Sequence, residues 1–257
     1  MELPAQVTGS NLTSGTFYDG EDRNYTYLYD KSLYTSLWIA YPLYKATCSG
    51  TDKYSGSWKS TPGFTASEQI NIWSGSYGVD YGDSDLYARG HQIPDADRQY
   101  NETMVKQTYY AINSTPQIQY GFNGGVWNSL EGSVRNLVIN KDETVYVVTG
   151  AAFQKGDENK EITWIQPAND SKMCPVPNYY WKALLKVKYD ENNEVKSALT
   201  VGFWFEHKIY SNSSFTNYSE KVDNIEEWTG FDLFANLPAS IAATAETNAN
   251  WNTFYNF

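Results

Sequence analysis

Large aromatic side chains alternate with polar ones along residues 25–48, which read YTYLYDKSLYTSLWIAYPLYKATC. Successive side chains of a β-strand point to opposite faces, so this alternation is typical of strands that are buried on one side only. Residues 30–32, Asp-Lys-Ser, interrupt the pattern with turn-forming residues. The segment therefore predicts a β-hairpin of two half-buried strands.

Three later segments have the β-branched and aromatic composition of strands, and the last two are separated by a turn sequence at 190–193. They are residues 145–149, 183–189 and 197–204. Because strands and helices are segregated along the chain, we expect an α+β fold with an antiparallel β-sheet core flanked by helices.

One long helix is predicted over residues 123–137. Its apolar residues recur at intervals of three and four and form a single stripe: Val126, Leu130, Val134 and Leu137. A shorter helix is expected near residue 228, with Asp223 as its N-terminal cap and Gly230 as its end.

The 257 residues contain no internal repeat or low-complexity linker, so residues 1–257 are expected to form a single domain. Residues 1–23 are predicted to be an extended lead-in with little packing. Residues 49–85, rich in Gly, Ser, Asp and Tyr, are expected to be a surface excursion. Hydrophobic content of 41% with 19% charged residues is typical of a soluble globular protein rather than a disordered one.

The formal net charge of −11 opposes tight, non-specific binding of nucleic acid, which usually needs a basic surface. It does not oppose catalysis, which needs only a local site. No apolar stretch approaches the roughly 20 residues of a membrane span.

A secreted, periplasmic or cell-surface location is expected, although the N-terminus has neither the charged start nor the apolar run of a signal peptide. A trimmed secreted chain would look the same. Cys48 and Cys174 are predicted to lie within bonding range if the protein is exported, and two buried free thiols are the alternative.

The chain contains two histidines, His91 and His207. His91 follows Arg89 and Gly90, so a cation and an imidazole flank a residue that allows close approach of the backbone. A lone histidine is more often structural than catalytic, and His207, at the end of a predicted strand, is interpreted as structural.

Asn123, Trp127, Glu131 and Arg135 are each four residues apart and would form one stripe on the predicted helix. Glu131 and Arg135 could then face the same pocket from successive turns. The alternative is a surface ion pair worth a few tenths of a kcal/mol, with Asn123 as a simple helix cap.

Together these residues form the ordered series RGHQIP, NSTPQ, FNGGVWNSLE and Arg135, followed by VYVVTGAAF, VPNYYWKALL and IEEWTGFDLFANLP. Over residues 24–238 the series resembles the DNA/RNA non-specific endonucleases, the ββα-metal or His-metal finger nucleases that include mitochondrial endonuclease G. The resemblance implies a ββα-metal finger active site and Mg²⁺-dependent hydrolysis of phosphodiester bonds in DNA and RNA.

The resemblance also implies a role for each site residue. His91 is expected to deprotonate water, and Asn123 to be the sole direct protein ligand of Mg²⁺, with Mn²⁺ as an alternative ion. Glu131 is expected to bind the water molecules of the metal, and Arg135 to contact phosphate. Arg89 would stabilise the transition state, and Asn113 would be a further active-site asparagine.

Two features depart from the family pattern. The usual signature is Asp-Arg-Gly-His, whereas Ala88 occupies the position of the aspartate. An upstream phosphate-binding arginine has no evident counterpart, and Arg98 is the candidate substitute. A homodimer and a protein inhibitor are both left open by the resemblance.

On one continuous helix, Asn123 and Glu131 would be rotated by about 80° and separated by about 12 Å along the axis. Both could not easily ligate one ion at about 2.1 Å. Direct contact from Asn123 and water-bridged contact from Glu131 are therefore expected.

Two rival functions remain at this stage. A family member that has lost activity and only binds nucleic acid or protein would explain Ala88 and the acidic charge. An extracellular carbohydrate-binding module would explain the aromatic content, but it gives no reason for the Arg-Gly-His motif.

Overall fold

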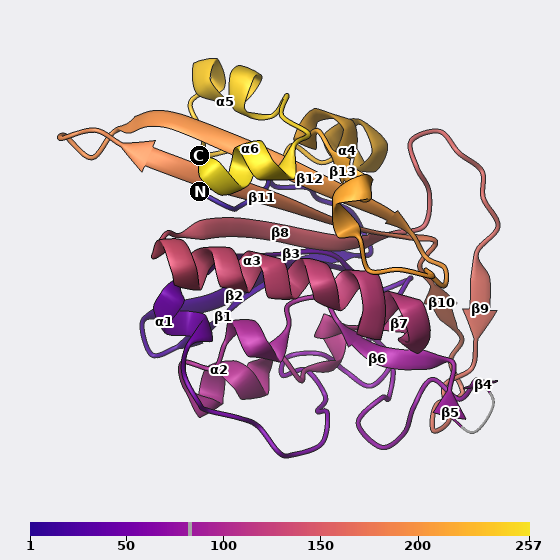
Figure 1. Ribbon diagram of the computed structural model, residues 1–257. Coiled ribbons are helices and arrows are strands. Elements are labelled where there is room, and N and C mark those ends of the chain that lie inside the picture. The colour runs from indigo at the N-terminus through magenta and orange to yellow at the C-terminus, as the bar shows by residue number, and fades with distance from the viewer. Residues whose placement is uncertain (82–83) are drawn as a thin grey trace.

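The core of the molecule is a seven-stranded antiparallel sheet with the order β1-β2-β3-β8-β11-β12-β13 (Figure 1). It is seen in a computed structural model that describes residues 1–81 and 84–257. Its strands are β1 (Leu12–Asp19), β2 (Asp22–Asp30), β3 (Thr35–Leu43), β8 (Val145–Ala152), β11 (Tyr179–Tyr189), β12 (Val195–Glu206) and β13 (Ser219–Glu220).

Smaller two-stranded sheets lie outside the main one. They pair β4 (Asp80–Tyr81) with β5 (Ser84–Asp85), β6 (Tyr87–His91) with β7 (Ser114–Ile118), and β9 (Thr163–Ile165) with β10 (Cys174–Val176). The helices are α1 (Lys45–Cys48), α2 (Glu102–Gln107), α3 (Asn128–Lys141), α4 (Val222–Thr229), α5 (Ala239–Ala245) and α6 (Trp251–Asn256). Four short helical segments are η1 (Asp95–Asp97), η2 (Ala111–Asn113), η3 (Gln119–Trp127) and η4 (Phe215–Tyr218).

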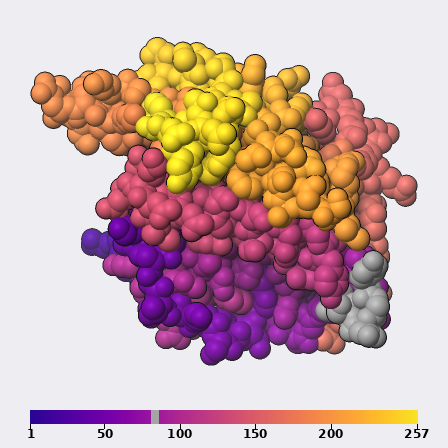
Figure 2. Space-filling model, viewed as in Figure 1, coloured from indigo at the N-terminus to yellow at the C-terminus, as the bar shows by residue number. Residues whose placement is uncertain are grey.

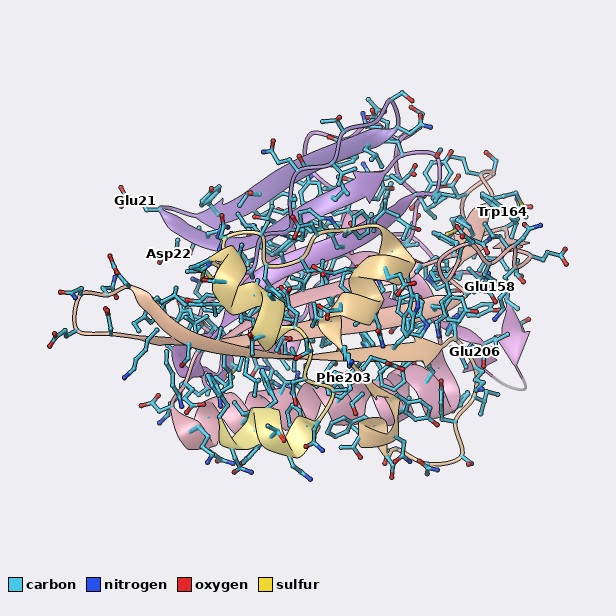
Figure 3. All side chains as sticks on the ribbon, turned by 90° about the horizontal axis from the view of Figure 1, so that it is seen from above. Glu21, Asp22, Glu158, Trp164, Phe203 and Glu206 are labelled. Atoms are coloured by element: carbon cyan, nitrogen blue, oxygen red, sulfur yellow. The ribbon has the colours of Figure 1, made fainter. Side chains whose placement is uncertain are left out.

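The two faces of the sheet support two separate hydrophobic layers. Along β11, Tyr180 and Leu184 join the core under α3, whereas Trp181, Ala183 and Leu185 join the core under α4. This is the two-residue alternation of a strand that is buried on both faces. Figure 3 shows the C-terminal helices crossing over the strands from above. The predicted α+β architecture is confirmed.

The predicted apolar stripe of the long helix is confirmed, but the start of the helix is not. Its four apolar members, Val126, Leu130, Val134 and Leu137, are all buried. The regular helix α3 begins only at Asn128, because the backbone of η3 leaves helical geometry at Tyr120, Gly121 and Gly125. Asn123 therefore neither opens nor caps α3, and the 80° and 12 Å expected for a continuous helix do not describe its relation to Glu131.

The first residues of the chain are packed, contrary to the lead-in predicted for residues 1–23. Leu12–Asp19 forms β1, the edge strand that pairs with β2. Glu2 is fully buried, and the backbone N–H of Ala5 donates to the carbonyl of Asp232 at 2.8 Å. The cause is the sheet itself, since the apolar face beneath α4 extends to its edge and the N-terminal residues cover it.

Residues 49–79 form no regular helix or strand, as the surface excursion predicted, yet they do not simply lie on the surface. Trp58, Ile70, Ile72 and Tyr77 are buried in a third hydrophobic cluster together with Cys174. The low density of apolar residues conceals this cluster in the sequence, because each anchor is isolated among polar neighbours.

The predicted hairpin between the last two long strands is confirmed, and its tip protrudes from the body of the molecule (Figures 1 and 2). The carboxylate of Asp190 accepts from the backbone N–H groups of Asn192 and Glu194, which closes the turn. At α4, Gly230 ends the helix in the left-handed region as predicted, whereas Asp223 lies inside its first turn and Lys221 is the capping position.

In the described part of the chain, no helix has the length and apolar character needed to cross a bilayer.

The bridge between Cys48 and Cys174 is not formed. Both residues are buried free cysteines, and they belong to different hydrophobic clusters. Burial raises the pKa of the Cys48 thiol to about 11 and raises that of Cys174 further still. Both groups are therefore neutral, unreactive thiols in the folded protein.

Alkylation should distinguish folded from unfolded protein at these two positions. Iodoacetamide at pH 8 should leave the native protein unmodified and should add two groups after unfolding, without any reductant. Intact-mass spectrometry makes the measurement. If the unfolded protein took up label only after reduction, the two cysteines would form a disulfide, which would contradict the free thiols of this fold.

Candidate active site

The antiparallel strands β6 and β7, followed by η3 and α3, lie beside the main sheet (Figure 1), and His91 is the last residue of β6. His91 pairs with Ser114 and Arg89 pairs with Pro116 in this strand pair. Strand alternation places Arg89 and His91 on one face and Ala88 and Gly90 on the other. The aspartate that Ala88 replaces would therefore point away from the imidazole.

Gly90 allows the two strands to be closely packed. A Cβ atom at this position would lie only 2.3–2.4 Å from three side-chain atoms of Gln117, a fully buried residue of the paired strand. Any larger residue in the middle of the Arg-Gly-His motif would push Gln117 aside, so the motif glycine is explained by packing.

The ring of His91 is half-buried between two aromatic side chains. Its centroid lies 4.6 Å from that of Trp58 and 4.9 Å from that of Tyr109, the latter in an edge-on arrangement. Burial lowers the pKa of His91 to about 4, with a smaller upward effect from Asp95 and a downward one from Arg89. At neutral pH the imidazole is therefore neutral and able to accept a proton.

The two ring nitrogens of His91 differ in their surroundings. Nε2 is enclosed by protein and has no hydrogen-bond partner among the described residues. Nδ1 is not enclosed in this way, and no described residue hydrogen-bonds to it. Nδ1 is thus the nitrogen that a water molecule could reach.

Arg89 is exposed and has no carboxylate partner in the described ranges. Its guanidinium donates to the carbonyl of Ile72 at 3.1 Å and lies 6.0 Å from the centre of the Trp58 ring. Trp58 therefore contacts both Arg89 and His91, and it orients the guanidinium next to the imidazole.

Asn113 is fully buried and holds the chain that leaves His91. Its Oδ1 accepts from the N–H of Ile93 at 2.9 Å, and its Nδ2 donates to the carbonyls of Ile93 and Thr108 at 2.9 and 2.7 Å. Both amide hydrogens are thereby used within the protein. Asn113 therefore fixes the backbone two residues after His91, and the further active-site role expected for it stays a prediction.

Asn123 lies in η3, outside any regular helix, and is half-buried. Its Nδ2 donates to Oε1 of Gln119 at 3.0 Å, and no described residue donates a hydrogen bond to its Oδ1. A neutral amide oxygen is a suitable ligand for a hard cation such as Mg²⁺. The residue present fits a metal role, and Gln119, which the sequence interpretation did not single out, fixes its orientation.

Glu131 lies in the first turn of α3, and burial raises the pKa of its carboxyl to about 7. Lys182 and Arg135 oppose this rise, whereas Asp97 adds to it. Arg135, one turn further along α3, does not simply pair with Glu131. Its guanidinium binds Oδ1 of Asp97 at 2.9 Å, and the hydroxyl of Tyr41 donates to Oδ2 of the same aspartate at 2.8 Å.

Arg98 cannot replace the missing phosphate-binding arginine. It is 1% exposed, and its guanidinium donates to the carbonyls of Asp97, Asn24 and Pro42 while lying over the ring of Tyr41. Every one of these contacts lies inside the protein. The prediction for Arg98 is wrong, because burial and three backbone acceptors make it structural.

His207 is structural, as predicted. Its Nε2 accepts from the N–H of Ile118 at 2.8 Å, and Nδ1 lies 2.8 Å from the carbonyl of Pro177. Both ring nitrogens are therefore engaged, and burial lowers the pKa of His207 to about 4.

A separate acidic cluster joins α4 to the end of α5. Carboxylate oxygens of Asp223, Glu226 and Glu246 lie within 4.8 Å of one another. The cluster belongs to the α4 side of the sheet, opposite the face that α3 covers, so it is no part of the His91 site.

The sequence interpretation missed the aromatic walls of the site and two of its charges. Trp58 lies in a segment without periodicity, and Asp97 and Tyr109 lie in short turns, so no pattern marks them. Lys182 did carry a signal: it is a lysine in the middle of an apolar run, with Trp181 before it and Ala183 after it.

An antiparallel sheet with a ββα unit that presents a neutral histidine, an amide oxygen and a carboxylate defines a class of metal-dependent nucleases. The sequence profile of the DNA/RNA non-specific endonucleases matches residues 9–240. The chain belongs to this family. The match begins before residue 24, where the resemblance was expected to start, and it includes β1.

Several relatives are named nucleases. The chain is 28% identical over 158 residues to the mitochondrial nuclease of Saccharomyces cerevisiae, covering 60% of this chain and 48% of that protein. It is 30% identical over 156 residues to nuclease C1 of Cunninghamella echinulata (60% and 59%) and 26% identical over 215 residues to the nuclease of Serratia marcescens (82% and 72%). The matched region is thus about half of the length of the first of these relatives.

A solved structure with the same fold is that of the EndoG/EndoGI complex, a study of EndoG inhibition. It superimposes with a TM-score of 0.70 at 17% identity and covers 88% of each chain. At this identity the likeness establishes the fold.

Two asparagine variants should separate a structural from a chemical role. Asn113→Ala should lower the free energy of unfolding by about 1–3 kcal/mol, because it leaves buried backbone groups of Ile93 and Thr108 without partners. Asn123→Ala removes one half-buried hydrogen bond and should change stability little. Urea unfolding measures both, and equal effects of the two variants would contradict the clamp assigned to Asn113.

Proposed function

We propose that the protein is a Mg²⁺-dependent endonuclease that hydrolyses phosphodiester bonds of DNA and RNA, with His91 as the general base. The observation that carries the proposal is a neutral imidazole that shares the Trp58 ring with the exposed Arg89 and whose Nδ1 has no hydrogen-bond partner among the described residues. The ββα unit that carries it also contains Asn123, whose Oδ1 accepts no hydrogen bond from any described residue. The family match and the names of the relatives support the reaction class.

His91 is suited to take a proton from the attacking water. Since its pKa of about 4 lies well below neutrality, the base form predominates across the physiological range. Trp58 and Tyr109 pack against the ring from two sides and fix its orientation. The direction of Nδ1 therefore does not depend on a hydrogen bond from a described residue.

Oδ1 of Asn123 is the group that would bind Mg²⁺, with Glu131 reaching the water molecules of the ion from α3. When bound, the ion would orient the phosphate and neutralise the leaving oxygen. A site with one amide, one carboxylate and many waters suits Mg²⁺, and Mn²⁺ next, better than zinc.

Arg89 is the cation that would contact a phosphate oxygen, because it is exposed and has no carboxylate partner among the described residues. Arg135 is bound by Asp97, so it would act on a phosphate through the electrostatic potential of that ion pair more than through direct contact with the phosphate. A site that addresses phosphate rather than base edges has little sequence preference. The overall charge of −11 fits weak binding outside this local site.

The secreted, periplasmic or cell-surface location of the protein stays a prediction. Relatives include mitochondrial nucleases and nucleases of Serratia and Nostoc, and the free thiols offer no sign of an oxidising compartment. Since the solved neighbour was studied with its inhibitor EndoGI, we include a protein inhibitor among the proposed partners. A homodimer is retained as a prediction.

Cleavage assays test the proposal directly. Supercoiled plasmid and single-stranded RNA should both be cut with Mg²⁺ and protected by EDTA. Asn123→Ala should abolish the metal-dependent cleavage, and Glu131→Gln should weaken it while the variant still binds the ion. If the wild-type protein cut neither substrate with Mg²⁺ or Mn²⁺ at high enzyme concentration, the proposed function would be rejected.

The two histidines should give opposite phenotypes. His91→Ala should reduce kcat by about 10²–10⁴-fold with a small change in the unfolding midpoint, because it removes a general base. His207→Ala should lower the midpoint, since it leaves the N–H of Ile118 without its acceptor, while folded molecules keep most of their activity. Rates measured well below both midpoints decide this, and similar losses for the two variants would reverse the assignment of the base.

A further inference from the structure

Lys182 lies in the middle of β11, a central strand of the sheet, where it pairs with Thr149 of β8 and Phe203 of β12. It has the same strand parity as Tyr180 and Leu184, which belong to the hydrophobic core under α3. A lysine therefore occupies a position between two large apolar side chains of the same strand face.

The ammonium group of Lys182 is enclosed without an ordinary partner. The residue is 1% exposed, and its Nζ has no hydrogen-bond acceptor within the described ranges. The ring of Trp127 lies next to the ammonium group, with its centre 4.9 Å from Nζ. An unpaired buried charge is costly, so packing alone does not explain this residue.

Glu131 follows Trp127 by one helical turn, so it lies near the ring that the Lys182 ammonium group contacts. Among the neighbouring charged groups, Lys182 has the largest effect on the pKa of the Glu131 carboxyl. Glu131 likewise has the largest effect on the pKa of Lys182. The other charges around them, Asp97 and Arg135, bind each other at 2.9 Å. Lys182 is therefore the cation left to compensate Glu131, and Trp127 keeps its ammonium in place from the preceding turn.

We propose that Lys182 is a positioning residue of the active site, which supports the Glu131 side chain from the central sheet and directs it toward the water shell of the metal. The inference rests on the proposed nuclease function and adds to it a residue from the central sheet. Glu131 reaches the site from α3, and Lys182 supports it from the strand beneath.

Lys186, four residues further along β11, offers a matched comparison. It lies on the same strand and the same face and is also buried, at 4% exposed. Its Nζ, however, binds Glu143 at 2.6 Å and the carbonyl of Phe254 at 3.2 Å. Lys186 is thus a buried lysine with a complete structural explanation and no link to Glu131.

The first experiment compares Lys182→Met with Lys186→Met. Methionine keeps the length and packing of the side chain and removes the charge. Lys182→Met should lower kcat/KM about 10–100-fold, the usual effect of losing a partner of a metal-site group. Lys186→Met should lower the unfolding midpoint and leave kcat/KM within about twofold. Lys182→Gln provides a second neutral variant if the methionine variant folds poorly.

A double-variant cycle with Glu131→Gln tests whether Lys182 acts through Glu131. If it does, adding Lys182→Met to Glu131→Gln should cost no further activity, because the group that Lys182 supports is already neutral. If the two losses multiply instead, Lys182 acts on its own or through the fold, and the inference is overturned.

The carboxyl ¹³C titration of Glu131 in the metal-free protein gives a readout that does not depend on cleavage. Lys182→Met should raise the pKa of Glu131 above that of the wild type, and Lys186→Met should leave it unchanged. An unchanged value in Lys182→Met overturns the inference even if the enzyme is active. An inactive wild type with the expected shift instead rejects the nuclease proposal and keeps the electrostatic link between Lys182 and Glu131.

Discussion

The ion pair between Arg135 and Asp97 joins the two halves of the site. Asp97 lies in η1, six residues after His91, and Arg135 lies on α3, one turn after Glu131. The hydroxyl of Tyr41, from the central sheet, donates to the same aspartate. A single carboxylate thus links the segment that carries His91, the proposed base, the helix that carries Glu131 and the sheet beneath them. Since removing one partner of such a buried pair costs about 3–5 kcal/mol, the relative position of these elements is firmly held.

Around this pair, the site concentrates charges that the rest of the interior excludes. Arg98, Lys182 and Glu131 all lie close to Asp97, and each is compensated by a different means. Arg98 donates to three backbone carbonyls, whereas Lys182 faces Glu131 and an indole ring. His91, on the other side, stays neutral because burial disfavours its charged form. The same low-polarity surroundings therefore produce a neutral base and an acid whose ionisation depends on its neighbours.

The amount that could be predicted from the sequence follows the range of the interactions involved. The apolar stripe from Val126 to Leu137 and the hairpin of β2 and β3 depend on neighbours a few residues away, and both were predicted correctly. The one-sided burial expected for that hairpin was wrong, because its two faces belong to two different hydrophobic clusters. The break at Gly125 was missed, since a continuous helical pattern conceals a change of backbone geometry. The packing of the N-terminal residues was missed because their partners belong to the far end of the chain, as the contact of Ala5 with Asp232 illustrates.

The properties of the candidate site can be separated by the same criterion, the range of the interactions that determine them. The sequence by itself determined the candidate residues His91, Asn123 and Glu131, because a short motif and a helical spacing bring chemically suitable groups into order. Only the tertiary structure decided how those groups behave. It made Asn113 a clamp and Arg98 a buried support, it enclosed one nitrogen of His91 and left the other free, and it set Lys182 behind Glu131. The physical reason is that burial, and with it the cost of a charge and the need for a hydrogen-bond partner, depends on residues that are distant along the chain and meet only when the sheet and helices pack.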